Sequence, residues 1–366
     1  MKTLFKTTYD QDIDLFEDTA HRLKIALLIA AAACAPFAVS DYILGELTYV
    51  LIWALAGLGV MLLSGHTGQP TLGHGAFLAC GAYCQAWLYN QGVPFVISFP
   101  LSGLFAGAVG ALIAIPALRM SGIYLAIATL AFGVIVEDMI VLLAPITGGI
   151  GGTFVDAITI AGISFDRWEA GGRNFYWLCL GVVVGITFLY ANLLRSPTGR
   201  AFTAIRDSEV SARAMGVNVA GTKTLAFGLS CFITGLAGAL LAHFLGAFNY
   251  EAFLVIISIL LLLMVTIGGL GSIHGAFFGA IVIGMLPQVV VYAREFTEAA
   301  TGIRLGNIPG LDYGVFALIL IAFIIIEPMG IYGRWLKIRI WFELFPLYRK
   351  GMFRRTRTYL KTERMR

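Results

Sequence analysis

The sequence predicts an all-α, polytopic integral membrane protein, a helix bundle with about ten transmembrane helices. Hydrophobic residues make up 59% of the 366 residues and charged residues only 13%, about half the charged share of a soluble domain. The mean hydropathy is +0.86. The apolar residues form runs near the roughly 20 residues that a helix needs to cross a bilayer. Strand-length alternation typical of a barrel is absent, so helices are the expected spanning structure.

Each predicted span is one of these apolar runs. The spans are 25–40, 43–63, 72–90, 94–118, 122–143, 175–193, 224–246, 252–268, 273–293 and 313–329. The first is short, and the closely spaced pairs could instead be hairpins or broken helices. Proline and glycine interrupt several spans, which is tolerated where neighbouring helices or cavity water satisfy the freed backbone groups.

Lysine and arginine predict the orientation, because cytoplasmic loops carry an excess of both. With ten spans, 21 of the 25 basic residues fall on the side that holds the termini. The four on the other side are Arg167, Arg173, Arg294 and Arg304. Both termini are therefore predicted to be cytoplasmic, with the protein in the inner (cytoplasmic) membrane. The predicted parts are a cytoplasmic N-terminal segment 1–24, a transmembrane domain 25–330 and a basic cytoplasmic tail 331–366.

Several segments interrupt or flank the spans. A polar, uncharged break covers 64–75, and an outward loop runs from 145 to 174. The basic tail is predicted to be an interfacial or disordered anchor on anionic lipid. The spacing of Gly275 and Gly279 permits close helix contact, either with a partner chain in the membrane or, as we favour, within the bundle.

The cytoplasmic segment 195–223 carries local signals for two short helices. Ser196 followed by Pro197 is typical of a helix start. Ser208 is placed to cap a second helix, which Gly216 would end in a left-handed conformation.

A helix pair of this kind would project rigidly from the membrane. Glu209 would lie in its favoured first turn. Small residues at Ser211, Ala212 and Ala214 would let a partner approach closely. The alternative is an ordinary positively charged loop.

Four stretches carry a family resemblance. They are GRAFTAIRDSEVSARAMGVN at 199–218, GHTGQPTLGHGAF at 65–77, TGG at 147–149 and GGLGSIHG at 268–275. The first resembles the coupling loop of ABC importer permeases, and all four resemble the LivM-type permeases of branched-chain amino acid transporters. The match runs from about residue 45 to 330. The general importer pattern is Glu-Ala-Ala followed three residues later by Gly, whereas here Glu209 lies seven residues before Gly216.

The resemblance implies a permease with four kinds of neighbour: a sister permease in a heterodimer, two cytoplasmic ATP-binding subunits, a periplasmic substrate-binding protein and the lipid bilayer. It implies that Arg206, Glu209, Ala212 and Gly216 couple the chain to the ATPases. No cofactor is expected in this chain, because ATP would bind to the partner subunits. A phosphate loop requires Gly-x4-Gly-Lys-Ser/Thr after a strand, and the nearest run, 216–224, places Lys one position late.

Candidates for the translocation path are Gln69, Thr71 and His74 in the uncharged break and Glu137 and Asp138 near the outward end of a span. Ionisable residues in spans are costly, so each is a candidate functional residue. The competing interpretation of the acidic pair is that it snorkels or faces a helix interface. No catalytic group, metal site or nucleic-acid partner is predicted.

The sequence therefore predicts a non-enzymatic importer permease for small amphipathic solutes, with branched-chain amino acids as the expected substrate. A urea or amide ABC permease is the nearest alternative. A secondary transporter driven by an ion gradient would need buried carboxylates, and the acidic residues are few and peripheral. A membrane-embedded enzyme would usually show paired acidic clusters, and none is present.

Overall fold

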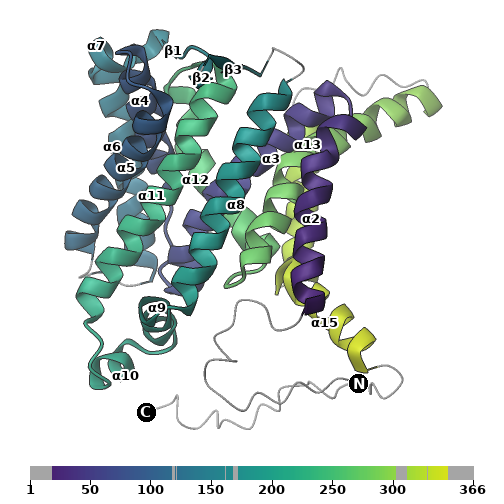
Figure 1. Ribbon diagram of the computed structural model, residues 1–366. Helices are drawn as coiled ribbons and strands as arrows, with labels where there is room; N and C mark the ends of the chain where they lie inside the picture. Colours follow the sequence, from purple (N-terminus) through teal and green to yellow (C-terminus); the bar gives the residue numbers. More distant parts are fainter. Residues whose placement is uncertain are drawn as a thin grey trace.

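The protein folds as a bundle of long helices (Figure 1). The computed structural model describes residues 19–117, 120, 122–160, 162–167, 172–301, 311–327 and 329–344. The helices are α2 (Thr19–Ala38), α3 (Asp41–Val60), the π-helix η1 (Met61–His66), α4 (His74–Asn90), α5 (Phe95–Ala117), α6 (Ile123–Leu142), α7 (Ala144–Thr147), η2 (Gly149–Gly151), α8 (Arg173–Arg195), α9 (Pro197–Asp207), α10 (Glu209–Ala214), α11 (Val219–Leu245), η4 (Tyr250–Phe253), α12 (Val255–Gly268), α13 (Ile273–Thr301), α14 (Leu311–Ile326) and α15 (Gly330–Leu344). The strands are β1 (Thr153–Phe154), β2 (Ile158–Ile160), β3 (Ile163–Phe165) and β4 (Ala247–Phe248).

Each of the ten predicted spans coincides with a helix. Among the described residues, seven helices are long and apolar enough to cross a membrane. They are α3 with η1, α5, α6, α8, α11, η4 with α12, and α13. The segments α2, α4 and α14 are not among the seven. The structure thus supports the polytopic helical class and leaves the figure of about ten spans unconfirmed.

The two ends of the bundle carry different elements. Figure 1 places α9, α10 and α15 at one end, and α7 with β1, β2 and β3 at the opposite end. Arg206 in α9 and Arg167 after β3 therefore lie at opposite ends, as the charge asymmetry predicts. Arg304 lies outside the described residues.

Helices α3 and α11 form the centre of the bundle. In each, 78% of the apolar window is buried inside the protein, against 17% for α8. α11 packs on α5, α4 and α3. Because lipid is as apolar as these side chains, helix association in a membrane depends on close packing and interhelical hydrogen bonds.

The contact between α4 and α11 shows both devices. A Cβ on Gly238 would overlap the carbonyl oxygen of Leu78, so only glycine permits this approach. Farther along the same helices, the amide of Gln85 bonds to His243 Nε2 at 3.0 Å and to Ser98 Oγ at 2.9 Å. His243 Nδ1 donates to the Asp156 carbonyl at 3.0 Å. The buried polar groups thus lock α4, α5 and α11 together.

The loop 145–174, predicted to face outward, contains more regular structure than the sequence predicts. β1 pairs antiparallel with β4, with Thr153 opposite Phe248, and β2 and β3 form a hairpin. The all-α class is supported, and the strands add two small pairs that the sequence did not predict. Runs of two or three residues are too short to show a strand period.

Two helices break inside the bundle. α3 widens into η1 and the chain then runs without helix from residue 67 to 73 before α4 begins. A second break, 269–272, separates α12 from α13. The two breaks touch, because a Cβ on Gly65 would lie 2.7 Å from the Gly271 amide nitrogen. Below, the first break means η1 together with residues 67–73, and the second break means residues 269–272.

The predicted terminal segments are partly described. Residues 1–18 and 345–366 lie outside the described part of the chain, while α2 begins at Thr19 and α15 covers the start of the predicted tail. In α15, Arg334 and Lys337 pair with Glu327 at 2.9 and 3.1 Å.

Helix contact at Gly279 predicts a stability defect on substitution. A Cβ on Gly279 of α13 would overlap the backbone of Met264 in α12, which confirms the predicted packing within the bundle. Overpacking costs roughly 1–3 kcal/mol, so Gly279→Val is expected to lower the melting temperature and the monodisperse yield in detergent. The control is Gly185→Val in α8, where a Cβ meets open space. Equal yields and melting temperatures for both variants would contradict this packing.

Candidate functional site

Helices α9 and α10 form the predicted pair at one end of the bundle. The Ser196 hydroxyl accepts a hydrogen bond from the Gly199 amide at 3.3 Å, and the Ser208 hydroxyl accepts one from the Ser211 amide at 3.2 Å. Each bond satisfies an amide that the helix itself leaves without a partner. Both predicted caps are therefore confirmed.

Gly216 ends α10 as predicted. Its φ is +86°, in the left-handed region, and its amide donates to the Arg213 carbonyl at 3.0 Å. A Cβ at this position would meet no atom within 4 Å. The requirement for glycine is thus conformational and does not come from crowding inside the chain.

The faces of α10 correct the predicted docking surface. Ala212 is 3% exposed and packs with Ile205 and Val219, so it faces α9 and α11 and not a partner. The exposed apolar residues are Val210 (81%) and Met215 (85%). Sequence analysis missed both, although two apolar side chains in a polar segment outside the spans were the available signal.

Glu209 is tied to its own chain. Its carboxylate pairs with the ammonium group of Lys223 in α11, whose side chain is 8% exposed. The resemblance implies that Glu209 couples this chain to a partner subunit. The structure adds a second role, an ion pair with Lys223 inside the chain. The ion pair fixes α10 against the bundle.

The first break gathers three of the path candidates. Gln69 is 8%, Thr71 1% and His74 0% exposed. The Leu72 amide donates to Thr129 Oγ1 of α6 at 3.0 Å, which holds the break against that helix. Gln69 and Thr71 thus lie in a buried, non-helical segment, and His74 is the first residue of α4 directly after it.

His74 links three helices. Its Nε2 lies 2.7 Å from Ser230 Oγ, and that hydroxyl donates to the Gly59 carbonyl at 2.6 Å. Since the carbonyl takes the serine proton, Nε2 of His74 must be the donor in the first bond. The chain of bonds joins α4, α11 and the end of α3.

Polar atoms without partners cluster at this break. Within the part of the chain that the structure describes, His66 Nε2, Gln69 Nε2 and His74 Nδ1 are buried and have no hydrogen-bond partner. A buried unpaired group costs about 1–3 kcal/mol, so each such group in a native structure calls for an explanation. Water or a polar solute in contact with the break would supply one.

The acidic pair lies elsewhere and its members differ. A carboxylate oxygen of Glu137 accepts from the Val255 amide, at the start of α12, where the N-cap residue Leu254 offers no side-chain acceptor. Glu137 therefore caps a neighbouring helix, which matches the helix-interface interpretation. Asp138 is exposed on α6. The structure does not bring this pair together with the first break.

A cavity of about 240 Å³ lies between α3, α4, α11 and the start of α12. Tyr49, Trp53, Glu251 and five aliphatic residues line it. Trp53 is 6% exposed, and its indole N–H has no partner among the described residues. None of the five path candidates lines this cavity. The sequence did not predict it, because its lining residues lie in apolar runs such as 50–63 that predict only a membrane span.

The Glu137 contact predicts a difference between adjacent acidic residues. Loss of a helix cap costs about 0.5–2 kcal/mol, so Glu137→Ala is expected to lower the melting temperature of the purified protein. Asp138→Ala, one position along the same helix, removes an exposed carboxylate and should leave it nearly unchanged. Thermal unfolding in detergent measures both, and a larger loss for Asp138→Ala would refute the capping role.

Comparisons with known proteins agree with this architecture. The family model described as "Branched-chain amino acid transport system / permease component" matches residues 42–324. The high-affinity branched-chain amino acid transport system permease protein LivM of Escherichia coli strain K12 is 34% identical over 295 residues, 75% of this chain and 68% of the relative. No solved structure matches.

More distant relatives show the breadth of the similarity. A probable branched-chain amino acid transport permease protein LivH of Methanocaldococcus jannaschii is 29% identical and covers 81% of this chain and 93% of its own. The autoinducer 2 import system permease protein LsrC of an Enterobacter species is 26% identical, covering 80% and 82%. The matched region spans all seven long apolar helices, both breaks and the α9–α10 pair. This chain therefore belongs to the family of permease components of branched-chain amino acid transport systems.

Proposed function

We propose that this chain is the membrane-spanning subunit of an ABC importer that forms part of the translocation path for branched-chain amino acids. The observation that carries the proposal is the capped α9–α10 pair, which presents Val210 and Met215 to solvent at one end of a helical bundle. Exposed apolar groups of this kind mark a surface for another protein. The relatives named above are transport permeases.

The partner at α9–α10 is proposed to be a cytoplasmic ATP-binding subunit. Arg213 on α10 is exposed beside the apolar pair, and the helix is held rigid by its cap and by the Glu209–Lys223 ion pair. A rigid element can pass on a displacement that a flexible loop would absorb. ATP would bind to the partner, and this chain would hold no cofactor.

The remaining partners and the location follow from the same proposal. A sister permease would complete the path, and a periplasmic binding protein would deliver the solute at the end that carries α7 and β1–β3. The predicted excess of basic residues at the α9–α10 end supports a cytoplasmic orientation of that end in the inner membrane. Both termini would then be cytoplasmic.

Gln69, Thr71 and His74 are proposed to line the path. The support is the set of buried polar atoms at the first break that lack partners. Backbone without helical bonds is tolerated at membrane depth where it is buried in protein or lines a cavity. A zwitterion can be held by such backbone groups and helix ends.

One observation favours a second candidate solute. The relative LsrC is named for autoinducer 2 import, which favours a solute other than a branched-chain amino acid as the second candidate; within the class, a urea or amide is the alternative that the sequence analysis gave. An ion-gradient mechanism has less support, because Glu137 is engaged as a helix cap.

The energy source is the direct test of the proposed class. Proteoliposomes that contain the full complex, this chain with its co-purifying sister permease and ATPases, are expected to accumulate labelled leucine when ATP is supplied to the ATPase side and the substrate-binding protein to the opposite side. A proton or sodium gradient without ATP should produce no accumulation. Urea, acetamide and autoinducer 2 serve as competing solutes in the same assay. Gradient-driven uptake by this chain alone would refute the importer proposal.

Gly216 provides a test of docking. A non-glycine residue in left-handed geometry costs roughly 1–2 kcal/mol, and a β-branched side chain would also project into the proposed interface. Gly216→Val is therefore expected to reduce ATPase co-purification and uptake while membrane insertion stays normal. Gly216→Asn should be milder, because Asn tolerates this geometry.

The control for Gly216 is Gly92→Val. Gly92 has a φ of +83° and, like Gly216, open space at its Cβ position, but it lies between α4 and α5, far along the chain from α10. The same backbone strain should therefore leave ATPase co-purification intact. Equal losses for both variants would show that strain alone explains the defect.

A further inference from the structure

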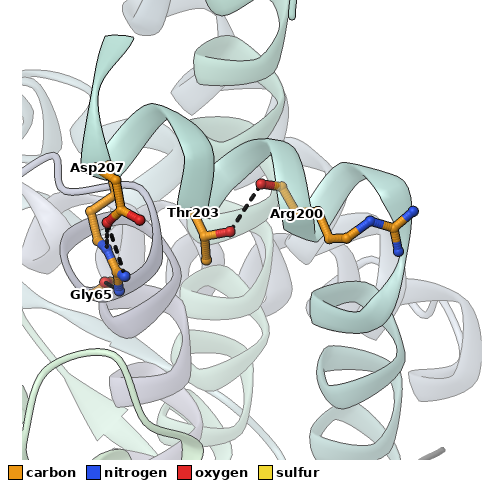
Figure 2. Close-up of polar contacts among 5 residues, drawn as sticks. Gly65, Arg200, Thr203 and Asp207 are labelled. Atoms are coloured by element: carbon orange, nitrogen blue, oxygen red, sulfur yellow. Dashed lines mark hydrogen bonds and ion pairs between the residues drawn. The ribbon is translucent and has the colours of Figure 1, made fainter. Parts of the chain in front are cut away.

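Arg206 lies in the last turn of α9 and points into the bundle. Figure 2 shows Asp207 beside Gly65, and the Arg206 guanidinium contacts both residues. Nη1 donates to the Gly65 carbonyl at 3.3 Å, and Nε and Nη2 both lie 3.2 Å from the same carboxylate oxygen of Asp207. The carboxylate on the solvent side thus orients the guanidinium, so that its remaining nitrogen reaches the first break.

Both breaks contact this one side chain. A Cβ on Gly68, in the first break, would lie 2.9 Å from Arg206 Cγ. A Cβ on Gly271, in the second break, would lie 3.3 Å from Arg206 Nη1. The arginine stem therefore rests on one break while its charged end lies against the other.

The contact has a physical reason at the helix end. η1 finishes at His66, so the Gly65 carbonyl belongs to its last turn. Carbonyls there lack helical partners and carry the negative end of the helix dipole, which favours a cation. Thr67 Oγ1 donates to the Leu63 carbonyl in the same turn. Side chains therefore hold the first break in place: Thr67 from within it and Arg206 from α9.

A second basic residue on α9 has a different contact. Arg200 donates through Nη1 to the Arg195 carbonyl at 3.0 Å, at the junction of α8 and α9. It lies six positions before Arg206 on the same cytoplasmic helix. Arg200 is therefore a matched control for any effect of removing one positive charge from α9.

We propose that Arg206 is the positioning residue that makes α9 and the two breaks move together, so that displacement of α9 by a partner is passed to the buried polar groups of the first break. The inference rests on the proposed function. It assigns Arg206 to the bundle side of the α9–α10 pair, whereas Val210 and Met215 form the partner side. Loss of the Arg206 side chain should then uncouple solute transport from ATP hydrolysis without preventing the ATPase from associating with this chain.

The first experiment uses the full complex in proteoliposomes and measures ATPase co-purification, ATP hydrolysis and leucine uptake. Arg206→Gln is expected to keep co-purification and basal hydrolysis but to lower uptake about tenfold, within the range for loss of coupling between linked sites. Arg200→Gln should behave like the unmodified chain. Arg206→Lys, which keeps the charge but loses the planar fork, should be intermediate.

Three outcomes would overturn the inference. One is normal uptake in Arg206→Gln, and another is loss of ATPase co-purification in parallel with uptake, which would place Arg206 in the docking surface. The third is an equal defect in Arg200→Gln. Failure of the proposed function is distinguishable, because the unmodified complex itself would then show no ATP-driven uptake.

A covalent replacement of the contact tests the mechanism even if Arg206→Gln folds poorly. A Cβ on Gly68 would lie 3.5 Å from the Arg206 Cβ, which fits the Cβ separation of a disulfide, about 3.5–4.5 Å. In Gly68→Cys/Arg206→Cys, uptake should be low under reducing conditions and should recover on oxidation. Arg206→Cys alone should stay low in both. A confirmed cross-link without recovery would show that the contact does not transmit movement.

Discussion

The constraint on which this structure depends is that every buried backbone group needs a partner in a medium without water. Unbroken helices meet it internally, and most of the chain consists of such helices. The two breaks do not, and they lie beside each other in the bundle. Partners for their backbone must come from side chains of other helices, so the breaks are the points where distant parts of the sequence are joined.

These joins order the bundle by linking separate helices. Ser230 of α11 donates to Gly59 and accepts from His74, and Thr129 of α6 accepts from Leu72. The two Ser230 contacts are buried and the Leu72 contact is partly buried, while the Arg206 side chain is 38% exposed and comes from a helix at the end of the bundle. The first break is thus held by α6 and α11 within the bundle and by Arg206 on the side of α9. Under the function that we propose, the Arg206 contact is the one that a partner docked at α9 and α10 would displace.

Much of the fold could be predicted because its signals are local. Apolar runs predict helices through their length, and each predicted span coincides with one. The short strands and the π-turn at Met61–His66 were missed, since two or three residues carry no period and a widened turn has no sequence signature in an apolar run. At the candidate site, the Ser196 and Ser208 caps and the left-handed Gly216 were predicted, because each depends on neighbours within a few positions.

The sequence by itself determined the helical membrane class, the charge asymmetry and the start and end of α9 and α10. Only the tertiary structure decided which face of each element has a partner. It buried Ala212, paired Glu209 with Lys223 14 residues away and placed Glu137 on an amide 118 residues away. It also joined Arg206 to a carbonyl 141 residues away. Helix caps are satisfied within one turn, whereas these contacts depend on how separate helices cross, and that is fixed by packing of the whole bundle.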